Sequence, residues 1–289
     1  MNEQSLEFKL TGKELEQQSY NIHYMIEGLD FSQKIIEQAY LTLINRVNIT
    51  DNDRDNIKIY ARNMRDGSFE ADIIIYIKEA SASLLPFYAS ANAKDIWNLA
   101  KNTYEYLKAV FLANKRGEKI VYNISDSPGV VIAPGNEGTV ISANRDVVEN
   151  ANNSYHHFRN FSENLSDQKG FNGFSLKDTE NEEEAVKITE SEKNIFKNEP
   201  YLEPGEINFK GIYTNAGISN YGGKIEITDP LESGLNQRYY PFDFMDKSNE
   251  QLFREGYVRE REYVGFKKMK FNLETLKNEV IGIRILSVL

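Results

Sequence analysis

Two runs of alternating apolar and polar residues, separated by an Asp-Gly pair, constrain the fold of this chain more than any other feature. In the first run, Ile57, Ile59 and Ala61 alternate with polar residues. The second run continues this alternation from Phe69 to Ile77. A period of two residues is typical of a strand with one buried face, and Asp-Gly tolerates the positive φ angles of a tight turn. The pattern therefore predicts a β-hairpin.

The other patterns in residues 1–117 predict a compact α/β unit around this hairpin. Alternation from Leu6 to Leu10 predicts a first strand. Apolar residues spaced three to five apart predict an amphipathic helix from Asp30 to Arg46 and a longer helix that has Ile96 to Phe111 on one face. The longer helix is expected to end in the basic turn and glycine stop Lys115-Arg116-Gly117. We therefore expect an N-terminal α/β domain with a β-hairpin and two main helices.

Residues 118–205 have weaker local patterns and hold most of the negative charge. The chain has a formal charge of −10, and residues 118–200 contribute 8 basic and 15 acidic side chains to it. We expect an irregular acidic connecting region, in which residues 180–197 form a charged helix. Two interpretations stay open. The region is either a solvated linker or a surface that docks on a basic partner, and it could do so by imitating DNA. Such a region argues against broad binding to nucleic-acid backbones, which needs clustered Lys and Arg.

The last part of the chain, residues 206–289, predicts a small, mostly β domain. It contains five or so short strand patterns in fewer than 90 residues, which is typical of a small barrel. A short helix is expected over residues 248–256. The predicted fold class is therefore α+β, with the domains 1–117, 118–205 and 206–289.

The chain has no cysteine, which excludes disulfides and thiolate chemistry and fits a reducing compartment. The N-terminus lacks an apolar signal segment, and no apolar run reaches the roughly 20 residues of a membrane helix. We expect a cytoplasmic protein that does not contact membranes. No nucleotide-binding glycine pattern is present, and we expect no cofactor.

Histidine occurs only at positions 23, 156 and 157, which leaves few places for a metal or acid–base site. The adjacent His156 and His157 lie near Asp146 and Glu149 in the sequence. No spacing typical of a metal site accompanies them, and a polar surface pair is the favoured interpretation. A metal-dependent hydrolase or nuclease that uses these four residues is kept as an alternative function.

Aromatic residues gather in a stretch rich in Asn, Ser and Gly that has the composition of a loop. Aromatic side chains in such a context are typical of anchors that fill pockets of a partner protein, although local core packing explains them equally well. Together with the glutamate cluster that follows, they are the candidate partner-binding residues: Tyr155, Phe158, Phe161, Phe171, Phe174, Glu182, Glu183 and Glu184.

Several short strings resemble a family of two-domain proteins from bacterial prophages and defence islands. The resemblance implies a role in phage–host conflict, for example inhibition of an antiphage defence complex as by anti-Gabija proteins, and it implies no catalytic residue. The strings are Gly67-Ser68-Phe69-Glu70 leading into Asp72-Ile73-Ile74-Ile75, Gly211-Ile212-Tyr213-Thr214-Asn215, Gly223-Lys224-Ile225 and Phe253-Arg254-Glu255-Gly256-Tyr257-Val258.

The first functional hypothesis is therefore a non-enzymatic protein-binding protein in phage–host conflict, which forms a homo-oligomer. A further alternative is a nucleic-acid-binding β-barrel, although direct nucleic-acid binding is the less favoured interpretation. That alternative requires exposed aromatics and five basic residues on one face of the barrel. The five are Arg259, Arg261, Lys267, Lys268 and Lys270.

Overall fold

The chain folds into two compact units, Met1–Lys197 and Asn198–Leu289. Helices and strands both occur in the first unit, and strands dominate the second, which confirms the predicted α+β class. The computed structural model describes residues 2–12, 22–65, 69–78, 92–125, 129–135, 138–166, 171–180, 184–217, 221–246, 254 and 256–289.

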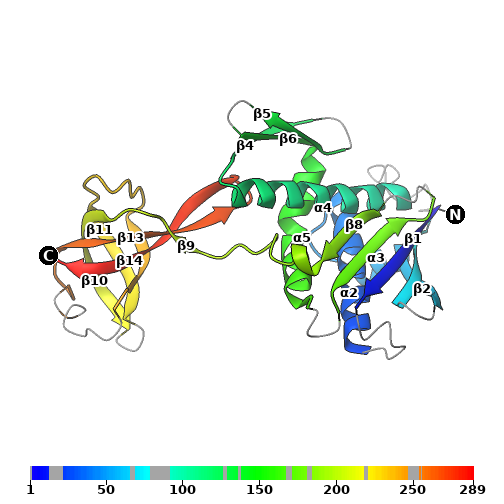
Figure 1. Cartoon of the computed structure of the whole chain (residues 1–289), viewed down its shortest axis with the longest axis horizontal. Coiled ribbons are helices and arrows are strands. Elements are labelled where there is room, and N and C mark those ends of the chain that lie inside the picture. The colour runs from blue at the N-terminus through cyan, green and yellow to red at the C-terminus, as the bar shows by residue number, and fades with distance from the viewer. Residues whose placement is uncertain are drawn as a thin grey trace. The chain divides into compact units, whose positions relative to one another are not determined.

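A five-stranded sheet forms the base of the first unit, with strand order β2-β3-β1-β7-β8 and antiparallel pairing between neighbours (Figure 1). The predicted hairpin is present, because Ile57 lies opposite Ile77 and Ile59 opposite Ile75. Its Asp66-Gly67 turn lies outside the described residues. The strands are β1 (Asn2–Thr11), β2 (Ile57–Arg65), β3 (Phe69–Ile77), β7 (Gly173–Asp178) and β8 (Glu184–Thr189).

Among the described residues, helices cover only one face of this sheet (Figure 1). Aromatic rings join them to it: Phe31 stacks on Phe161 with ring centroids 4.2 Å apart, and both rings contact Phe174 of β7. Apolar sheet residues such as Phe8 are fully buried beneath them. The opposite face carries the polar residues of the same strands. The helices of this unit are α2 (Ile22–Leu43), α3 (Asp51–Asn56), α4 (Ala93–Lys115) and α5 (Arg145–Asn164).

The first turns of α4 and α5 are capped by asparagine side chains. Asn92 accepts a hydrogen bond from the backbone N–H of Asp95 at 2.8 Å, and Asn144 accepts one from Val147 at 2.9 Å. Each cap satisfies a backbone donor that has no partner within its helix. The longer predicted helix thus starts at Ala93, three residues before the first apolar residue of its pattern.

A buried amide links α2, α4 and α5 inside this core. The fully buried Asn150 accepts a hydrogen bond from Thr42 Oγ1 at 3.0 Å and donates one to Thr103 Oγ1 at 2.7 Å. Polar groups in a core cost free energy unless they are paired. Because one side chain pairs with hydroxyls of two other helices, it selects the relative register of all three.

A separate three-stranded sheet with the order β4-β6-β5 belongs to the same unit. β6 pairs with β4 in parallel and with β5 in antiparallel orientation. Several of its aliphatic side chains are exposed, among them Ile124 and Val131. Its strands are β4 (Lys119–Ile124), β5 (Val131–Gly135) and β6 (Gly138–Ala143), and a short 3₁₀ helix, η2 (Glu190–Glu192), follows β8.

The middle of the chain differs from the predicted irregular connecting region. Residues 118–197 belong to the first unit and supply α5, β7 and β8 to it. The helix expected over residues 180–197 is wrong, because β8 occupies part of that range. Val186 and Ile188 are buried opposite Leu176 and Phe174 of β7, so their spacing of two fits a strand.

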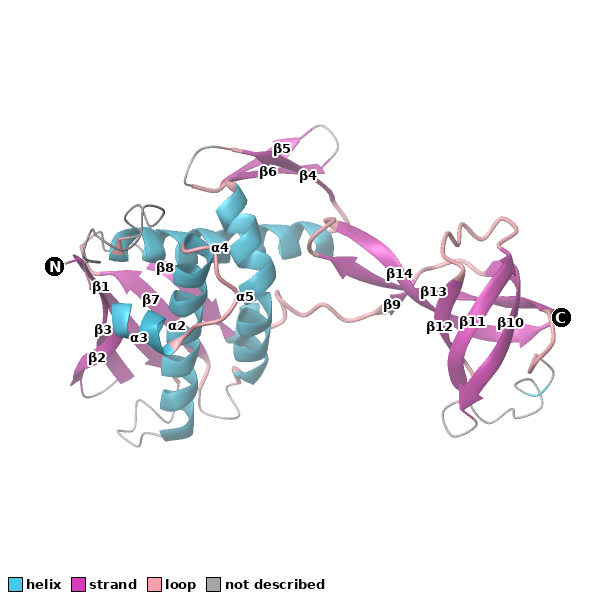
Figure 2. Ribbon diagram, turned by 180° about the vertical axis from the view of Figure 1, so that it is seen from behind, coloured by secondary structure: helices cyan, strands magenta, loops and turns pink. Residues whose placement is uncertain are grey.

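The second unit is a closed barrel of five strands with the order β10-β11-β12-β14-β13, in which β13 also pairs with β10 (Figure 2). β12 and β14 are parallel, and the other pairings are antiparallel. This confirms the predicted C-terminal barrel, while the helix expected over 248–256 lies largely outside the described residues. The strands are β10 (Ile207–Gly217), β11 (Gly222–Asp229), β12 (Tyr239–Phe244), β13 (Arg261–Asn272) and β14 (Lys277–Val288), and β9 (Tyr201–Leu202) pairs with β13.

The barrel interior is filled by aromatic and aliphatic side chains. Phe209 stacks on Tyr263 with ring centroids 5.4 Å apart, and Tyr213 packs against Phe242 at 4.7 Å. Burial raises the pKa of the Tyr213 and Tyr263 hydroxyls, which therefore stay neutral. In the part of the chain that the structure describes, no helix has the length and hydrophobicity needed to span a membrane.

We expect Asn150→Ala to lower the free energy of unfolding of the first unit by about 1–3 kcal/mol, because two buried hydroxyls lose their partner. Trp97, the one tryptophan of the chain, is buried in α4 and reports on this unit alone. Urea denaturation followed by its fluorescence measures the effect. The matched control is Asn153→Ala at an exposed position of the same helix, where we expect a change within about 0.5 kcal/mol. Equal stability of the two variants would contradict the role of Asn150.

Candidate binding face of the barrel

The aromatic residues predicted to bind a partner lie in the core of the first unit. Phe158, Phe161, Phe171 and Phe174 are at most 5% exposed. Tyr155 is half-buried, stacks on the ring of Phe111 and donates its hydroxyl hydrogen to the backbone oxygen of Phe196 at 2.8 Å. The loop-like composition was misleading because Phe158 and Phe161 lie one turn apart on the buried side of α5. The prediction that these rings fill partner pockets is therefore corrected.

The structure does not describe the side chains of the three glutamates that were also predicted to bind a partner. Glu182 and Glu183 lie outside the described residues. Glu184 is the first residue of β8, and its side chain lies outside the described part as well.

His156 and His157 follow each other on α5, with ring centroids 3.8 Å apart. Burial, and then the neighbouring His156, lower the pKa of His157 to about 4, so its imidazole is neutral at pH 7. Asp146 and Glu149 lie nearer the start of the same helix. Within the described ranges, no three His, Asp or Glu side chains come close enough together to hold a metal ion.

The five basic residues of the barrel alternative do not gather on one face. Adjacent residues of a strand point to opposite sides, and Lys267 and Lys268 accordingly have different partners. Lys267 pairs with Glu203 at 3.2 Å, whereas Lys268 pairs with Asp243 at 3.1 Å. Of the five, only Lys268 belongs to the surface that is described in the following paragraphs. Arg259, Arg261 and Lys270 are not among the residues of that surface.

A different group of cations surrounds an exposed aromatic ring on the outside of β11 and β12. Tyr239 is 40% exposed. The Nζ atom of Lys224 lies 4.9 Å from the centroid of its ring, and the Cζ atom of Arg238 lies 5.3 Å from it. Glu226, which is opposite Tyr239 in the strand register, holds the Arg238 guanidinium at 2.6 Å. The ring is thus presented to solvent between two positive charges.

A carboxylate network continues this face onto β14 and β13. Asp243 lies opposite Arg284 in the parallel register and accepts two hydrogen bonds from its guanidinium, at 3.0 and 2.9 Å. Lys268 donates to the same carboxylate at 3.1 Å. Burial raises the pKa of Asp243, but the hydrogen bonds from Arg284 and Lys268 outweigh it and leave the pKa below its ordinary value. Asp243 is therefore ionised at neutral pH and orients both cations.

These residues form one surface, which we call the barrel face. Tyr239 and Asp243 alternate along β12 with Tyr240, Phe242 and Phe244, which point into the core. The surface holds four cations and two carboxylates, so it has a net positive charge in a protein with an overall charge of −10. Lys224 and Arg238 lie beside the exposed ring, and Lys268 and Arg284 pair with Asp243. Its members are Lys224, Glu226, Arg238, Tyr239, Asp243, Lys268 and Arg284.

Known proteins offer no direct guide to this surface. No family model matches the chain, and neither a curated protein nor a solved structure matches it. The strand order itself is informative: numbered within the barrel it reads 1-2-3-5-4, with strands 1 and 4 paired and strands 3 and 5 parallel. Five-stranded oligonucleotide/oligosaccharide-binding (OB) barrels bind their ligands on the face of strands 2 and 3. In this chain the second and third strands of the barrel are β11 and β12, and Tyr239 lies on β12.

Sequence reasoning missed the barrel face, although one signal was present. In the sequence, Tyr239 belongs to a crowded aromatic group with Tyr240, Phe242 and Phe244. The alternation of Tyr239, Pro241 and Asp243 with Tyr240, Phe242 and Phe244 separates the exposed from the buried members. No sequence pattern indicated that Arg284 of β14 and Lys268 of β13 are the partners of Asp243, because these contacts depend on the register between strands.

We expect Asp243→Asn to weaken the pairing of β12 with β14, because Arg284 and Lys268 lose their common anion. A cost of about 1 kcal/mol is expected for this partly exposed network, measured as faster amide hydrogen exchange in β12 and β14. The pKa of Asp243 is lowered on folding, so its contribution is complete above about pH 4 and is lost as the pH falls further. Wild type and variant should therefore differ at pH 7 and converge in acid. A difference that does not shrink as the pH falls below about 4 would contradict this account.

Proposed function

We propose that the protein is a non-enzymatic binding protein whose barrel binds single-stranded nucleic acid across the barrel face. The observation that carries the proposal is the exposed ring of Tyr239 between Lys224 and Arg238, on the two strands that OB barrels use for ligands. The topology contributes analogy only, since one fold hosts many functions. The chemistry of the barrel face is therefore the main support for single-strand binding.

That chemistry fits the two components of single-strand recognition. An unpaired base stacks on an aromatic ring, and this contact is worth about 1–3 kcal/mol per base. Cations beside the ring attract the phosphates that flank the base. Tyr239 offers the ring, and Lys224, Arg238, Lys268 and Arg284 offer the charges along adjacent strands. A double helix fits less well, because its bases are already stacked on each other.

The acidic character of the chain limits this binding without preventing it. Residues 201–289 carry 12 basic and 13 acidic side chains, so the surplus of negative charge lies elsewhere in the chain. On the barrel face, the negative charges of Glu226 and Asp243 offset two of the four positive charges. We therefore expect weak binding that neutralises about two or three phosphates, with a slope of about −2 in the logarithm of affinity against the logarithm of salt.

The expected role in phage–host conflict, with a protein partner and a homo-oligomer, stays a prediction. The buried aromatics no longer support a partner site at residues 155–174. We propose nucleic-acid binding by the barrel instead. The residues of the barrel face carry this proposal, and of the five basic residues predicted from the sequence only Lys268 is among them.

We expect Tyr239→Ala to weaken binding of a fluorescein-labelled single-stranded oligonucleotide by about 5- to 150-fold, the equivalent of one lost stacking contact. Fluorescence anisotropy at low salt measures the affinity. The matched control is Tyr201→Ala, because Tyr201 on β9 is exposed to a similar degree, 46%, and lies outside the barrel face. The control variant should bind like wild type.

The salt dependence separates stacking from charge. Lys224→Ala should reduce the magnitude of the salt slope by about 1, whereas Tyr239→Ala should leave it nearly unchanged. Absence of binding at low salt, or equal losses in the Tyr239 and Tyr201 variants, would overturn the proposed function.

A further inference from the structure

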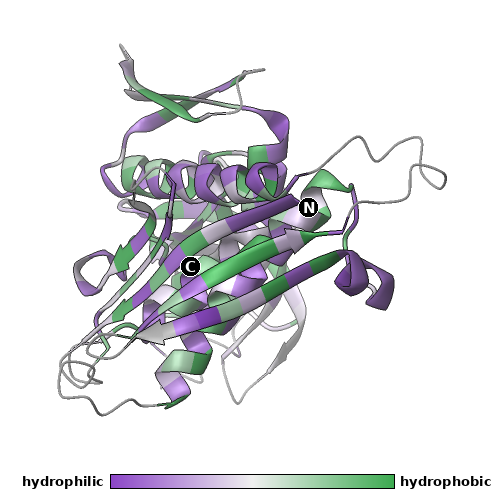
Figure 3. Cartoon of the chain, turned by 90° about the vertical axis from the view of Figure 1, so that its right-hand side faces the viewer, coloured by the Kyte–Doolittle hydropathy of each residue, from purple (hydrophilic) through white to green (hydrophobic). Residues whose placement is uncertain are grey.

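The polar face of the five-stranded sheet in the first unit contains a hollow of about 220 Å³. This face lies opposite the helices, and polar and apolar residues alternate along its strands (Figure 3). The hollow lies over β1, β7 and β8, far in sequence from the barrel face. Its lining residues are Glu7, Lys9, Thr11, Gly173, Phe174, Ser175, Lys177, Lys187 and Thr189.

A glycine at the start of β7 lines one end of the hollow. Gly173 of β7 lies between Thr11 of β1 and Thr189 of β8 in the sheet register. A Cβ atom at this position would collide with Thr11 Oγ1. The side chain of Thr11 therefore occupies the space above Gly173, and both residues line the hollow.

The next row of the sheet adds cations on both sides of a serine. Ser175 of β7 lies opposite Lys9 on one side and opposite Lys187 on the other. Lys177, two residues further along β7, also lines the hollow. Glu7 is the one carboxylate in the lining, so the charged lining residues sum to +2, in a chain whose total charge is −10.

The ion pairs on this face leave donors for a ligand. Lys9 pairs with Glu70 at 2.6 Å, and Lys177 pairs with Glu7 at 3.4 Å. A lysine ammonium has three N–H donors, so one carboxylate contact leaves donor capacity on each. The side chains of Lys9 and Lys177 are 38% and 29% exposed, which keeps them accessible at the mouth of the hollow.

We propose that this hollow binds a phosphoryl group. Ammonium groups bind phosphate as point charges, and hydroxyl groups complete its hydrogen bonds. Three lysines and the hydroxyl of Ser175 line the hollow. The hydroxyls of Thr11 and Thr189, which also line it, donate to Asn172 and Glu192. A phosphoryl group presents three terminal oxygens to these donors, whereas a carboxylate presents two. The site is independent of the barrel face, because it uses other residues of another unit.

The test titrates the ¹⁵N-labelled full chain with inorganic phosphate, and separately with glycerol phosphate, at constant ionic strength set by chloride. We expect saturable shifts of the Gly173 and Ser175 amide signals. Tighter binding of glycerol phosphate than of phosphate would identify a phosphomonoester as the ligand class, and the reverse order would identify the free anion. Absence of saturable shifts at millimolar concentration of either compound would overturn the proposal.

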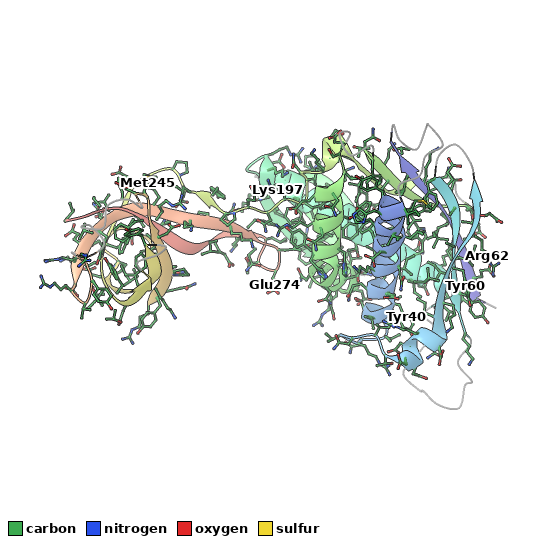
Figure 4. The ribbon with its side chains drawn as sticks, turned by 90° about the horizontal axis from the view of Figure 1, so that it is seen from below. Tyr40, Tyr60, Arg62, Lys197, Met245 and Glu274 are labelled. Atoms are coloured by element: carbon green, nitrogen blue, oxygen red, sulfur yellow. The ribbon has the colours of Figure 1, made fainter. Side chains whose placement is uncertain are left out.

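Two variants on the same sheet face make the test specific. The double variant Lys9→Met, Lys187→Met should weaken phosphate binding at least about tenfold. Lys58→Met is the matched control, because Lys58 lies on β2, the edge strand that also carries Tyr60 and Arg62 (Figure 4), and pairs with Asp55. It should bind phosphate like wild type, and so should Tyr239→Ala. Equal weakening in the double variant and in Lys58→Met would show general charge screening and would overturn the site.

Unfolding of a variant is distinguishable from loss of the site. The fluorescence of Trp97 and the dispersion of amide signals outside β1, β7 and β8 report whether the first unit is folded. Ser175→Ala is a smaller change at the centre of the same row, and it should weaken phosphate binding without altering either signal. Unchanged phosphate affinity in both folded variants, Ser175→Ala and the double lysine variant, would overturn the proposal.

Discussion

The first unit depends on one constraint: the apolar side of its five-stranded sheet has to be covered, and helices cover that side alone. At the centre of this contact, the ring of Phe8 meets Phe69 and Phe174 edge-on, at 5.5 and 5.6 Å. Gly28 brings α2 so close that an added Cβ would lie 2.9 Å from Phe8 and Leu10. Because side chains alternate along a strand, burial of these rings fixes Lys9 and Thr11 on the opposite, polar face. The phosphoryl site we propose follows from how the core is packed.

The barrel applies the same rule to a closed sheet. Tyr240, Phe242 and Phe244 fill its interior, and this arrangement requires Tyr239 and Asp243 to face outward. Pairing of β10 with β13 closes the ring of strands. Within the ring, each strand therefore pairs with neighbours on both sides. The binding that we propose for the barrel relies on the side chains of β11 and β12, which include an exposed aromatic ring and cations.

Sequence reasoning succeeded where the deciding contacts are local. The hairpin of β2 and β3 and the strands of the barrel follow from alternation and turn residues within short windows. It failed at Phe158 and Phe161, because an Asn-rich amphipathic helix resembles a loop in composition. Glutamates hid the alternation of Val186 and Ile188 in the same way. The sequence could not predict the proposed phosphoryl site, because its residues come from distant segments that only the sheet register brings together. Thr11, for example, donates a hydrogen bond to Asn172, 161 positions away.

The total charge of −10 is a poor guide to what this chain binds, because charges act over short distances in salt. At physiological ionic strength the screening length is about 8 Å, so acidic residues elsewhere affect a bound anion little. What matters is the arrangement within each surface. On the barrel face, Glu226 and Asp243 reduce the net charge, yet they hold Arg238, Arg284 and Lys268 in place. These carboxylates lower the net positive charge of the face and orient its cations. In the binding that we propose, the shape of the ligand and its stacking on Tyr239 therefore matter more than its charge density.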